Sequence, residues 1–440
     1  MMEIEKNFFD VVVVGAGPAG VSAATTIARG GRKVLLLERG VSAGSKNMIG
    51  GAVFLSALKE IFPDSYKNAP IERYINKHTW SLLDKKSSVD VTYDNQVSQT
   101  SASIYRSKFD SWLVEEAKKA GVYFSPQTLV LSAIVENDRV VGVKTELEEI
   151  YAPITILADG VNSLLAKQLG LKDEHESKDI VLAVKETIKL SKEIIDTRFN
   201  VDFAQKQGAM RNFIGGLSDD NQEAPFALGF MYTYQDAVSI GLGVNLKDLE
   251  DLSLNPSELL DKLKEHPVVK PLIQGGELLE YSAHLIPEGG YNKLPKLSDA
   301  GVMVVGDAAG FVNGVHFEGT NFAMISGKLA GETALWAISA NEFDKNAMQV
   351  YEKKLKNSFV MKDLKSYKNV IESLYSRTNS IMKYYPKKAC EFFEIFTGAL
   401  GVPKRESFRG LICDFFKQRS LAEFFADLKA FIVAVFGVLK

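Results

Sequence analysis

The 440-residue sequence predicts an α/β protein built on a parallel sheet, with an inserted antiparallel sheet and a helical C-terminal region. Three observations lead to this fold class. The apolar run Val11–Val14 leads directly into Gly15-x-Gly17-x-x-Gly20, a second apolar run Val34–Leu37 ends at Glu38, and strand-like segments in the middle third alternate between polar and apolar residues. Continuous apolar runs are typical of parallel strands covered on both faces, whereas alternation is typical of antiparallel sheets.

The glycine-rich turn has the spacing and context of a dinucleotide-binding site. In such a turn Gly15 permits the tight bend, Gly17 lets the backbone approach a pyrophosphate, and Gly20 lets the helix pack closely on the strand. The following helix presents unpaired N–H groups and its positive dipole end to the phosphates. Glu38 stands where a carboxylate binds a ribose, so we predict a bound dinucleotide.

The next elements follow from their start and stop residues. A helix over Pro18–Arg29 opens with proline and stops at Gly30-Gly31. Ser107-x-x-Asp110 reads as a capping box that opens a second helix, which ends at Gly121. Residues 128–143 read as a hairpin whose turn is Asn137-Asp138.

Two further buried strands end in a carboxylate beside a glycine. The strand over residues 154–158 is followed by Asp159-Gly160, and the strand over 302–305 by Gly306-Asp307. Open α/β sheets place ligand contacts at such strand ends. Between them, strands near 181–187, 226–234 and 238–244 indicate an inserted sheet. A helix rich in small residues then runs from Gly319 to Ala337.

The length exceeds the size at which a single core stops growing, so several domains are expected. We predict a cofactor domain over residues 1–170, an inserted substrate domain over 171–300, a return segment of the cofactor domain over 301–342, and a helical region over 343–440.

The motifs together resemble the glutathione-reductase-type FAD proteins of the p-hydroxybenzoate-hydroxylase-like branch, which have a Rossmann-like fold. The resemblance is carried by the glycine turn with Glu38, by Arg106, by Ala158-Asp159-Gly160-x-x-Ser163 and by Gly306-Asp307-Ala308-Ala309-Gly310. It implies that Asp307 holds the ribityl and pyrophosphate part of FAD. It also implies that the helix after Gly319 points its N-terminus at the flavin pyrimidine, where it favours an anionic reduced flavin.

Longer segments are similar to the FixC family, which is related to electron-transfer-flavoprotein:quinone oxidoreductase. They are residues 44–51 (GSKNMIGG), 105–110 (YRSKFD), 156–163 (ILADGVNS) and 280–288 (EYSAHLIPE), within a match from about residue 8 to 380. The resemblance implies one FAD that takes electrons from the alpha and beta subunits of an electron-transfer flavoprotein and reduces a membrane quinone, menaquinone or ubiquinone. In the four-subunit complexes of this family the flavoprotein pair bifurcates electrons from NADH, and a small ferredoxin-like iron–sulfur subunit accompanies the FixC-type chain.

The cofactor-binding residues that these motifs and resemblances predict are Gly15, Gly17, Pro18, Ala19, Gly20, Glu38, Arg39, Lys46, Asn47, Gly50, Gly51, Arg106, Asp159, Gly160, Gly306, Asp307, Gly319, Thr320 and Asn321. No metal site is predicted in this chain.

Candidate residues for the quinone side of the reaction come from the inserted domain and from the segment after the Gly-Asp motif. An apolar wall is possible from Phe230, Met231 and Tyr232 in the inserted domain and from Phe311, Val312 and Phe317 after the Gly-Asp motif. His284 and His316 are possible proton donors, because imidazole titrates near neutral pH. For each of these residues ordinary core packing is the competing interpretation.

Only two cysteines occur, Cys390 and Cys413, and we expect both to be buried apolar thiols. The single-chain quinone oxidoreductases that the sequence resembles carry a four-cysteine iron–sulfur module, and a [4Fe–4S] cluster needs about four thiolates. Two cysteines cannot hold it, so the cluster of this electron path is predicted on a separate polypeptide.

The last hundred residues differ in charge from the rest. From Lys345 to Lys440 the net charge is +9, against −3 for the whole chain, and ten phenylalanines lie between Phe392 and Phe436. The longest apolar run, Ala430–Leu439, is half of the roughly 20 residues that a span needs. The first residues, Met1–Glu5, have no signal-peptide character. We therefore expect a peripheral protein on the cytoplasmic face of the membrane, with an interfacial C-terminal surface and no nucleic-acid partner. An ordinary helical cap with a solvated lysine face is the alternative.

Two other enzyme classes share these FAD motifs. A geranylgeranyl-reductase-type enzyme also acts on an isoprenoid lipid, but residues 230–235 lack the Trp and Pro of the Tyr-x-Trp-x-Phe-Pro pattern that is typical of that family. A flavin monooxygenase of the p-hydroxybenzoate-hydroxylase branch is the other. A flavin-binding assembly subunit without activity is the third alternative.

Overall fold

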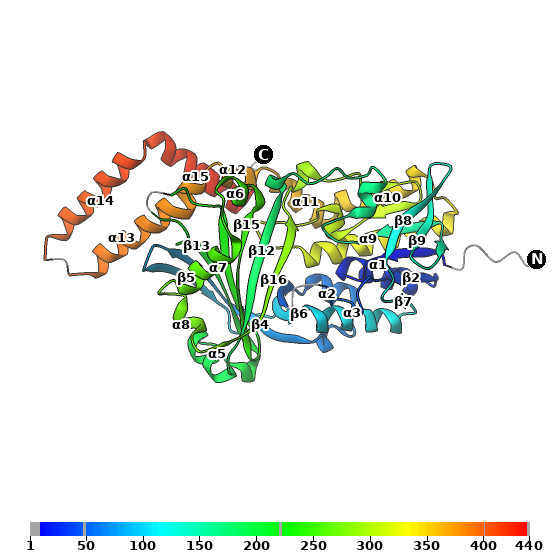
Figure 1. Ribbon diagram of the computed structural model, residues 1–440, viewed down its shortest axis with the longest axis horizontal. Coiled ribbons are helices and arrows are strands. Elements are labelled where there is room, and N and C mark those ends of the chain that lie inside the picture. Colours follow the sequence, from blue (N-terminus) through cyan, green and yellow to red (C-terminus); the bar gives the residue numbers. More distant parts are fainter. Residues whose placement is uncertain (1–8, 47–49, 220–221, 400, 438–440) are drawn as a thin grey trace, which may run out of the picture. The chain divides into compact units, whose positions relative to one another are not determined.

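The computed structural model describes residues 9–46, 50–219, 222–399 and 401–437. The chain divides into two compact units (Figure 1). The first comprises residues 1–71, 100–179 and 285–368, and the second comprises 72–99, 180–284 and 369–440. Residues 72–99 thus belong with the inserted sheet, and the helical C-terminal region is divided between the units at residue 368, both unlike the boundaries expected from the sequence.

The first unit is centred on a mainly parallel sheet with strand order β17-β18-β11-β1-β2-β7. All four residues of β1, β2 and β11 are buried, as expected for strands covered on both faces. Val14 of β1 is paired with Leu37 of β2 on one side and with Leu157 of β11 on the other. The strands are β1 (Val11–Val14), β2 (Val34–Leu37), β7 (Tyr123–Ser125), β11 (Ile154–Leu157), β17 (Ser298–Asp299) and β18 (Val302–Val304).

Helices α1 (Pro18–Arg29) and α9 (Thr320–Ala340) pack against each other, and two glycines of α9 lie close to the backbone of α1. A Cβ on Gly327 would lie 2.0 Å from the carbonyl oxygen of Ala19, and one on Gly331 would lie 2.8 Å from that of Ala23. The small residues noted in the sequence are therefore what lets α9 approach the first helix.

The remaining elements of the first unit include the predicted hairpin and the helix with the predicted capping box. The hairpin predicted over residues 128–143 is confirmed, and its turn residues Asn137 and Asp138 have φ of 50° and 59°. The predicted capping box is wrong: α3 begins at Arg106, its N-cap Tyr105 provides no side-chain cap, and Asp110 binds Arg106 instead. These elements are β3 (Gly50–Phe54), α2 (Ser56–Ile61), β6 (Ser101–Tyr105), α3 (Arg106–Lys119), β8 (Val130–Glu136), β9 (Arg139–Thr145), β10 (Glu149–Tyr151), α4 (Leu164–Gln168), α10 (Lys345–Asn357) and α11 (Phe359–Ser366).

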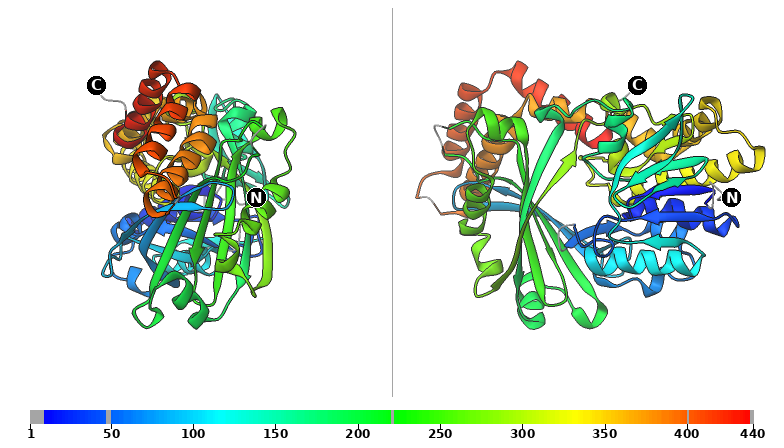
Figure 2. Two further views of the ribbon diagram at one scale, coloured as in Figure 1. Left: turned by 90° about the vertical axis from the view of Figure 1, so that its left-hand side faces the viewer. Right: turned by 45° about the vertical axis from the view of Figure 1, so that its right-hand side comes forward.

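The second unit contains a largely antiparallel sheet in the order β16-β12-β15-β14-β13-β4, with β5 paired to β4 (Figure 2). Its core is apolar, with Phe213, Met231, Ile240 and Leu263 almost fully buried. The strands are β4 (Ile71–Leu83), β5 (Ser88–Asp94), β12 (Ile180–Lys189), β13 (Gln207–Gly215), β14 (Ala227–Thr233), β15 (Ala237–Asn245) and β16 (Glu277–Pro287), and the short helices are α5 (Lys192–Phe199), α6 (Leu246–Asp251), α7 (Pro256–Glu265) and α8 (Lys270–Ile273).

The second unit ends in a helical segment. After α12 (Val370–Tyr375) and a π-helical turn at Ser380–Tyr384 come three helices that we call the tail helices: α13 (Tyr385–Thr397), α14 (Lys404–Gln418) and α15 (Leu421–Phe436). Helices α13 and α14 lie side by side, and α15 packs on α12 (Figure 1). No helix in the described part of the chain is long and apolar enough to cross a bilayer.

Candidate functional site: a dinucleotide cradle in the first unit

The three glycines of the first turn differ in what surrounds them. A Cβ on Gly15, whose φ is +103°, would lie 2.3 Å from the carbonyl oxygen of Ala158. A Cβ on Gly20 would lie 1.9 Å from the carbonyl oxygen of Gly15, whereas one on Gly17 would meet no atom within 4 Å. Packing therefore requires Gly15 and Gly20, and Gly17 faces open space, as the close approach of a pyrophosphate requires.

The start of α1 has the features of an anion-binding helix N-terminus. Its N-cap is Gly17, which provides no side-chain cap, Pro18 is in the first turn, and no acidic residue lies there. The first N–H groups of a helix have no partner within it, and they add to the positive end of the dipole. A phosphate placed over this turn accepts those N–H groups.

Glu38 lies at the end of β2 beside the glycine turn. Its Oε2 accepts the N–H of Ala16 at 3.0 Å, and its Oε1 accepts the N–H of Gly40 at 2.7 Å. These two bonds fix the carboxylate in place. Each oxygen keeps a lone pair that can accept a ribose hydroxyl.

Asp159 follows β11 and is mostly enclosed. Its Oδ2 accepts the N–H of Leu165 at 3.3 Å, and its Oδ1 is buried without a partner among the described residues. Burial raises the pKa of Asp159, opposed by backbone hydrogen bonds and by the charge of Lys172. Gly160 adopts φ of +77°, which turns the chain back toward the sheet edge.

The Gly306-Asp307 turn is a short 3₁₀ segment, Gly306–Ala309, that packs directly on the other motifs. A Cβ on Gly306 would lie 2.8 Å from the Cβ of Ala19, and the N–H of Gly306 donates to Ser326 Oγ at 3.0 Å. Ser163 Oγ donates to the carbonyl oxygen of Ala308 at 3.1 Å. The three motifs that lie far apart in the sequence therefore meet at one edge of the parallel sheet.

Two buried amide side chains, one in the first turn of α9 and one in the loop before it, each have one polar atom without a hydrogen-bond partner among the described residues. Gly319 is the N-cap and provides no side-chain cap. Asn321, 3% exposed, has an unpartnered Oδ1, and Asn313, also 3% exposed, has an unpartnered Nδ2, counting partners among the described residues. Buried polar atoms are nearly always hydrogen-bonded in folded proteins, so these atoms and Asp159 Oδ1 indicate that a polar ligand completes the site.

Lys172 is a component that the sequence analysis missed. Its Nζ donates to the carbonyl oxygen of Ala308 at 2.9 Å. Burial lowers the pKa of Lys172 to about 8, with the charge of Lys167 acting in the same direction and the carboxylates of Asp159 and Asp307 opposing it. Nothing in the local sequence marks this lysine, because it follows a short helix and matches no motif.

The other predicted cofactor-binding residues differ in their contacts and in their exposure to solvent. Arg106 is held by Asp110, at 2.8 Å from Oδ2, and a Cβ on Gly44 would lie 2.6 Å from the Arg106 carbonyl oxygen. Arg39 and Lys46 are exposed, and Asn47 lies outside the described residues. Gly50 and Gly51 begin β3.

The term cofactor cradle is used below for five features together: the glycine turn, Glu38, the Asp159-Gly160 turn, the 306–310 turn and the N-terminus of α9.

The residues considered for the quinone wall have mixed surroundings. Met231 is fully buried in the core of the second unit, and Phe311 is fully buried in the first unit. Tyr232 stacks on Phe230 at 5.9 Å between ring centroids and accepts a hydrogen bond from the buried Lys185 at 3.2 Å. Phe317 is 40% exposed. His284, in β16, is half-buried.

The cysteine prediction is half right. Cys390 is buried, but Cys413 is exposed on α14. Across residues 9–46, 50–219, 222–399 and 401–437, no group of three His, Cys, Asp or Glu side chains is arranged to hold a metal ion.

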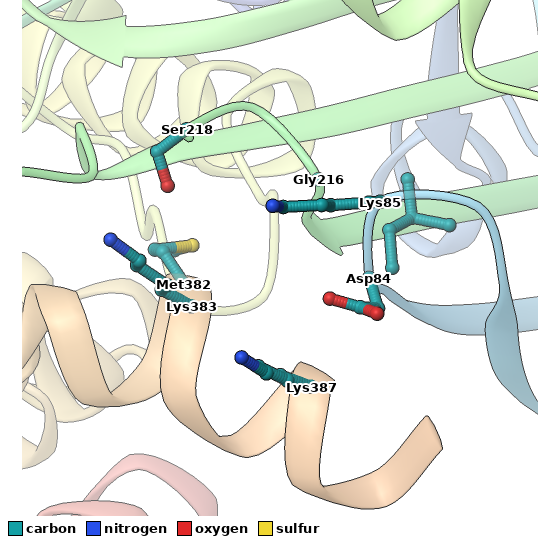
Figure 3. Close-up of a pocket in the computed structure, with 8 residues that line it drawn as sticks. Asp84, Lys85, Gly216, Ser218, Met382, Lys383 and Lys387 are labelled. Carbon is teal, nitrogen blue, oxygen red and sulfur yellow. The ribbon is translucent and has the colours of Figure 1, made fainter. Parts of the chain in front are cut away.

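A small pocket in the second unit contains none of the predicted site residues (Figure 3). Lys383 donates to the carbonyl oxygens of Asp219 at 2.8 Å and of Gln222 at 2.9 Å, so its charge holds the neighbouring loop. The pocket is lined by Leu83, Asp84, Lys85, Gly216, Ser218, Met382, Lys383 and Lys387.

Comparison with known proteins agrees with the class that this fold and cradle define. The FAD dependent oxidoreductase family matches residues 10–168, which contain the glycine turn, Glu38 and the Asp159-Gly160 turn. A geranylgeranyl bacteriochlorophyll reductase-like protein from Thermoplasma acidophilum has a similar structure, with a TM-score of 0.68, 23% identity, and coverage of 84% of this chain and 91% of that one. The cofactor is FAD, and the protein is an FAD-dependent oxidoreductase.

Two curated relatives match nearly the whole chain. Protein FixC of Bradyrhizobium diazoefficiens is 37% identical over 436 residues, which cover 97% of this chain and 99% of that protein. The probable electron transfer flavoprotein-quinone oxidoreductase YdiS of Escherichia coli is 36% identical over 411 residues, covering 91% and 94%. The chain belongs to the FixC family.

Proposed function

We propose that this chain accepts electrons from an electron-transfer flavoprotein and reduces a membrane quinone, as the FixC-type subunit of a four-subunit electron-bifurcating complex. The observation that carries the proposal is the near full-length similarity to a relative named as a probable electron transfer flavoprotein-quinone oxidoreductase. The cofactor cradle supports it, since the transfer needs a flavin and no nucleophile or metal in this chain.

The cradle residues are proposed to hold FAD by groups that the fold already presents. The N–H groups at the start of α1 face the pyrophosphate, Glu38 accepts from a ribose, and Asp307 lies in the turn that meets α1. Asn321 Oδ1 and Asn313 Nδ2 are free to bond the cofactor's polar edge. Bound FAD supplies the redox chemistry that the side chains lack.

The iron–sulfur cluster of the electron path is proposed to lie on a separate ferredoxin-like subunit. This chain has two cysteines, one buried and one exposed, and they belong to different helices, α13 and α14. A [4Fe–4S] cluster needs about four thiolate ligands.

The tail helices are proposed to dock on the cytoplasmic face of the membrane. Helix α15 turns its carboxylate inward: Asp427 is 6% exposed and is held by Arg419 at 3.1 Å and by the hydroxyl of Tyr385 at 2.8 Å. Three of its four phenylalanines are exposed, Phe425 at 61%, Phe431 at 64% and Phe436 at 68%. The apolar side chains exposed over the tail helices are Phe392, Phe393, Phe396, Ile412, Phe416, Leu421, Phe425, Leu428, Phe431, Val435 and Phe436.

A helix that packs on the core of a globular protein buries its large apolar side chains and exposes its charged ones. Helix α15 shows the opposite arrangement. Large exposed apolar patches mark interaction surfaces, and exposed Arg405, Arg409 and Lys417 on α14 add the positive charge that attracts anionic lipids. The quinone is proposed to enter from the same membrane.

The test is reconstitution of the chain with both electron-transfer-flavoprotein subunits and the ferredoxin-like subunit in vesicles that contain menaquinone or ubiquinone. NADH-dependent quinone reduction that requires this chain is the expected result. Turnover of a geranylgeranyl lipid, or rapid NADPH oxidation with an aromatic acid, in place of quinone reduction would contradict the proposal.

A further inference from the structure

Glu288, whose carboxyl group is not part of the cradle, lies against the loop between the 306–310 turn and α9. Glu288 follows strand β16, and its backbone N–H donates to the carbonyl oxygen of Asp179 at 2.8 Å. Its side chain packs on Gly314: a Cβ at that position would lie 2.7 Å from Glu288 Oε1 and 3.0 Å from its Cδ. Any larger residue at position 314 would therefore displace the carboxyl group.

Gly314 belongs to the 313–318 loop, which joins the Gly306-Asp307 turn to the N-terminus of α9. Asn313 and Glu318 close this loop with backbone bonds in both directions, of 2.8 Å and 3.1 Å. Asn313 Oδ1 also accepts the N–H groups of Val315 and His316. Glu288 is thus packed on a closed loop that lies in the chain between two parts of the cofactor cradle, the 306–310 turn and the N-terminus of α9.

The Glu288 carboxyl has no hydrogen bond or ion pair among the described residues, and burial raises its pKa to about 7. The segments around it carry other titratable groups. Asp179 and Lys293 pair with each other at 3.3 Å, and the His316 ring contacts Tyr367. Burial raises the pKa of Glu318, with Asn321 opposing and Asp363 adding to the rise. Among the described residues, Glu288 therefore has no charged partner.

We propose that Glu288 takes up a proton when the flavin is reduced and releases it when the flavin is oxidised. This step rests on FAD occupying the cradle proposed above. The reductant supplies the electrons and the solvent supplies the proton, which forms an O–H bond on the carboxylate and leaves again on oxidation. Added negative charge nearby favours the protonated carboxyl, so proton uptake offsets the charge that the electrons bring.

The test is a redox titration of the FAD-loaded, full-length chain from about pH 5 to about pH 9. In the wild-type protein the flavin potential is expected to fall more steeply with pH from about pH 7 upward, where reduction takes up an additional proton. Glu288→Gln should remove the steeper segment. The matched control is Glu277→Gln, an exposed residue at the other end of β16, which should leave the profile unchanged.

Infrared difference spectra give a second readout. Reduction at about pH 8 should add the C=O stretch of a protonated carboxyl in the wild-type protein and in Glu277→Gln, but not in Glu288→Gln. Identical pH profiles for wild type and Glu288→Gln, or a carboxyl band that persists in the variant, would overturn the proposal.

Gly314→Ala provides a variant that keeps the carboxyl group. Its methyl group displaces Glu288 toward solvent, so the steeper segment should start at least about one pH unit lower. An unchanged start in Gly314→Ala would also overturn the proposal, even if Glu288→Gln were too unstable to measure. Because the titration needs neither electron-transfer flavoprotein nor quinone, its failure is distinct from failure of the proposed electron path.

Discussion

Single residues of the cradle serve two different requirements. Gly15 and Gly20 are needed because backbone atoms occupy the space where a Cβ would lie, whereas Gly17 faces open space. This difference agrees with the separate roles that the motif predicts, in which Gly15 and Gly20 serve the fold and Gly17 serves the cofactor.

Substitution should expose this difference. We expect Gly20→Ala to destabilise the apoprotein by about 1–3 kcal/mol, because its methyl group would overlap the Gly15 carbonyl oxygen. Gly17→Ala should leave the melting temperature of the apoprotein unchanged and weaken FAD binding by at least about tenfold. Thermal denaturation and FAD titration of both variants check this, and normal FAD affinity in a folded Gly17→Ala would contradict the placement of the pyrophosphate.

Lys172 gives a pH-dependent prediction. Its pKa is lower in the folded protein, about 8, than in the unfolded chain, so the unfolded state binds more protons between about pH 8 and about pH 10.5. The contribution of this lysine to stability therefore rises with pH through that window. Lys172→Met should stabilise the apoprotein at pH 7 by on the order of 1 kcal/mol, allowing for partial exposure, and the gain should fade by about pH 10.5.

The same substitution should weaken FAD binding, because it removes a positive charge that acts on Asp159 and Asp307 in the cradle. Chemical denaturation across pH and FAD titration at pH 7 measure the two effects. A stability gain that does not vary with pH would contradict the assigned titration.

At the scale of elements, α15 shows a polarity that periodicity alone does not assign. Its apolar residues predict one apolar helix face, which in most proteins faces the core. Here Arg419 and Tyr385 bind Asp427 on the inner face, and Phe425, Phe431 and Phe436 are exposed. The buried carboxylate of Asp427 and its two partners therefore determine which face of α15 is turned toward the protein.

We expect the double substitution Phe425→Ser and Phe431→Ser to weaken binding to phosphatidylglycerol-containing vesicles by at least about tenfold, since burying one phenyl ring stabilises by about 1.5–3 kcal/mol. Both side chains are exposed, so the melting temperature should not change. Tyr93→Ser on β5, also 63% exposed, is the matched control. Vesicle sedimentation that is the same for all three proteins would argue against docking through α15.

At the scale of the whole molecule, the cofactor content of the purified chain tests whether the iron–sulfur cluster lies on a partner subunit. The purified chain should contain about one FAD and no iron, since two cysteines on separate helices cannot ligate a cluster. Iron should appear only when a small ferredoxin-like subunit is co-purified. Absorbance spectroscopy and metal analysis measure both, and iron in the isolated chain, or full quinone activity without any partner, would contradict the proposed path.

The sequence alone determined the fold class, the FAD cofactor, the family and the positions of β1, α1, β11 and α9. These features depend on local patterns: continuous apolar runs, helix stop signals and glycine spacings that the backbone itself requires. The family resemblance added the motifs at residues 46–51 and 284–288.

The tertiary structure decided what depends on contacts between distant residues. In the structure, residues 72–99 belong to the unit that contains the inserted sheet. Asp110 is the partner of Arg106 and not part of a helix cap, and Cys413 is exposed. The tertiary structure also brought Lys172 to the Gly-Asp turn and Glu288 to Gly314. Such contacts form only when separate segments pack together, because burial and the loss of solvent are set by neighbours that no local pattern contains.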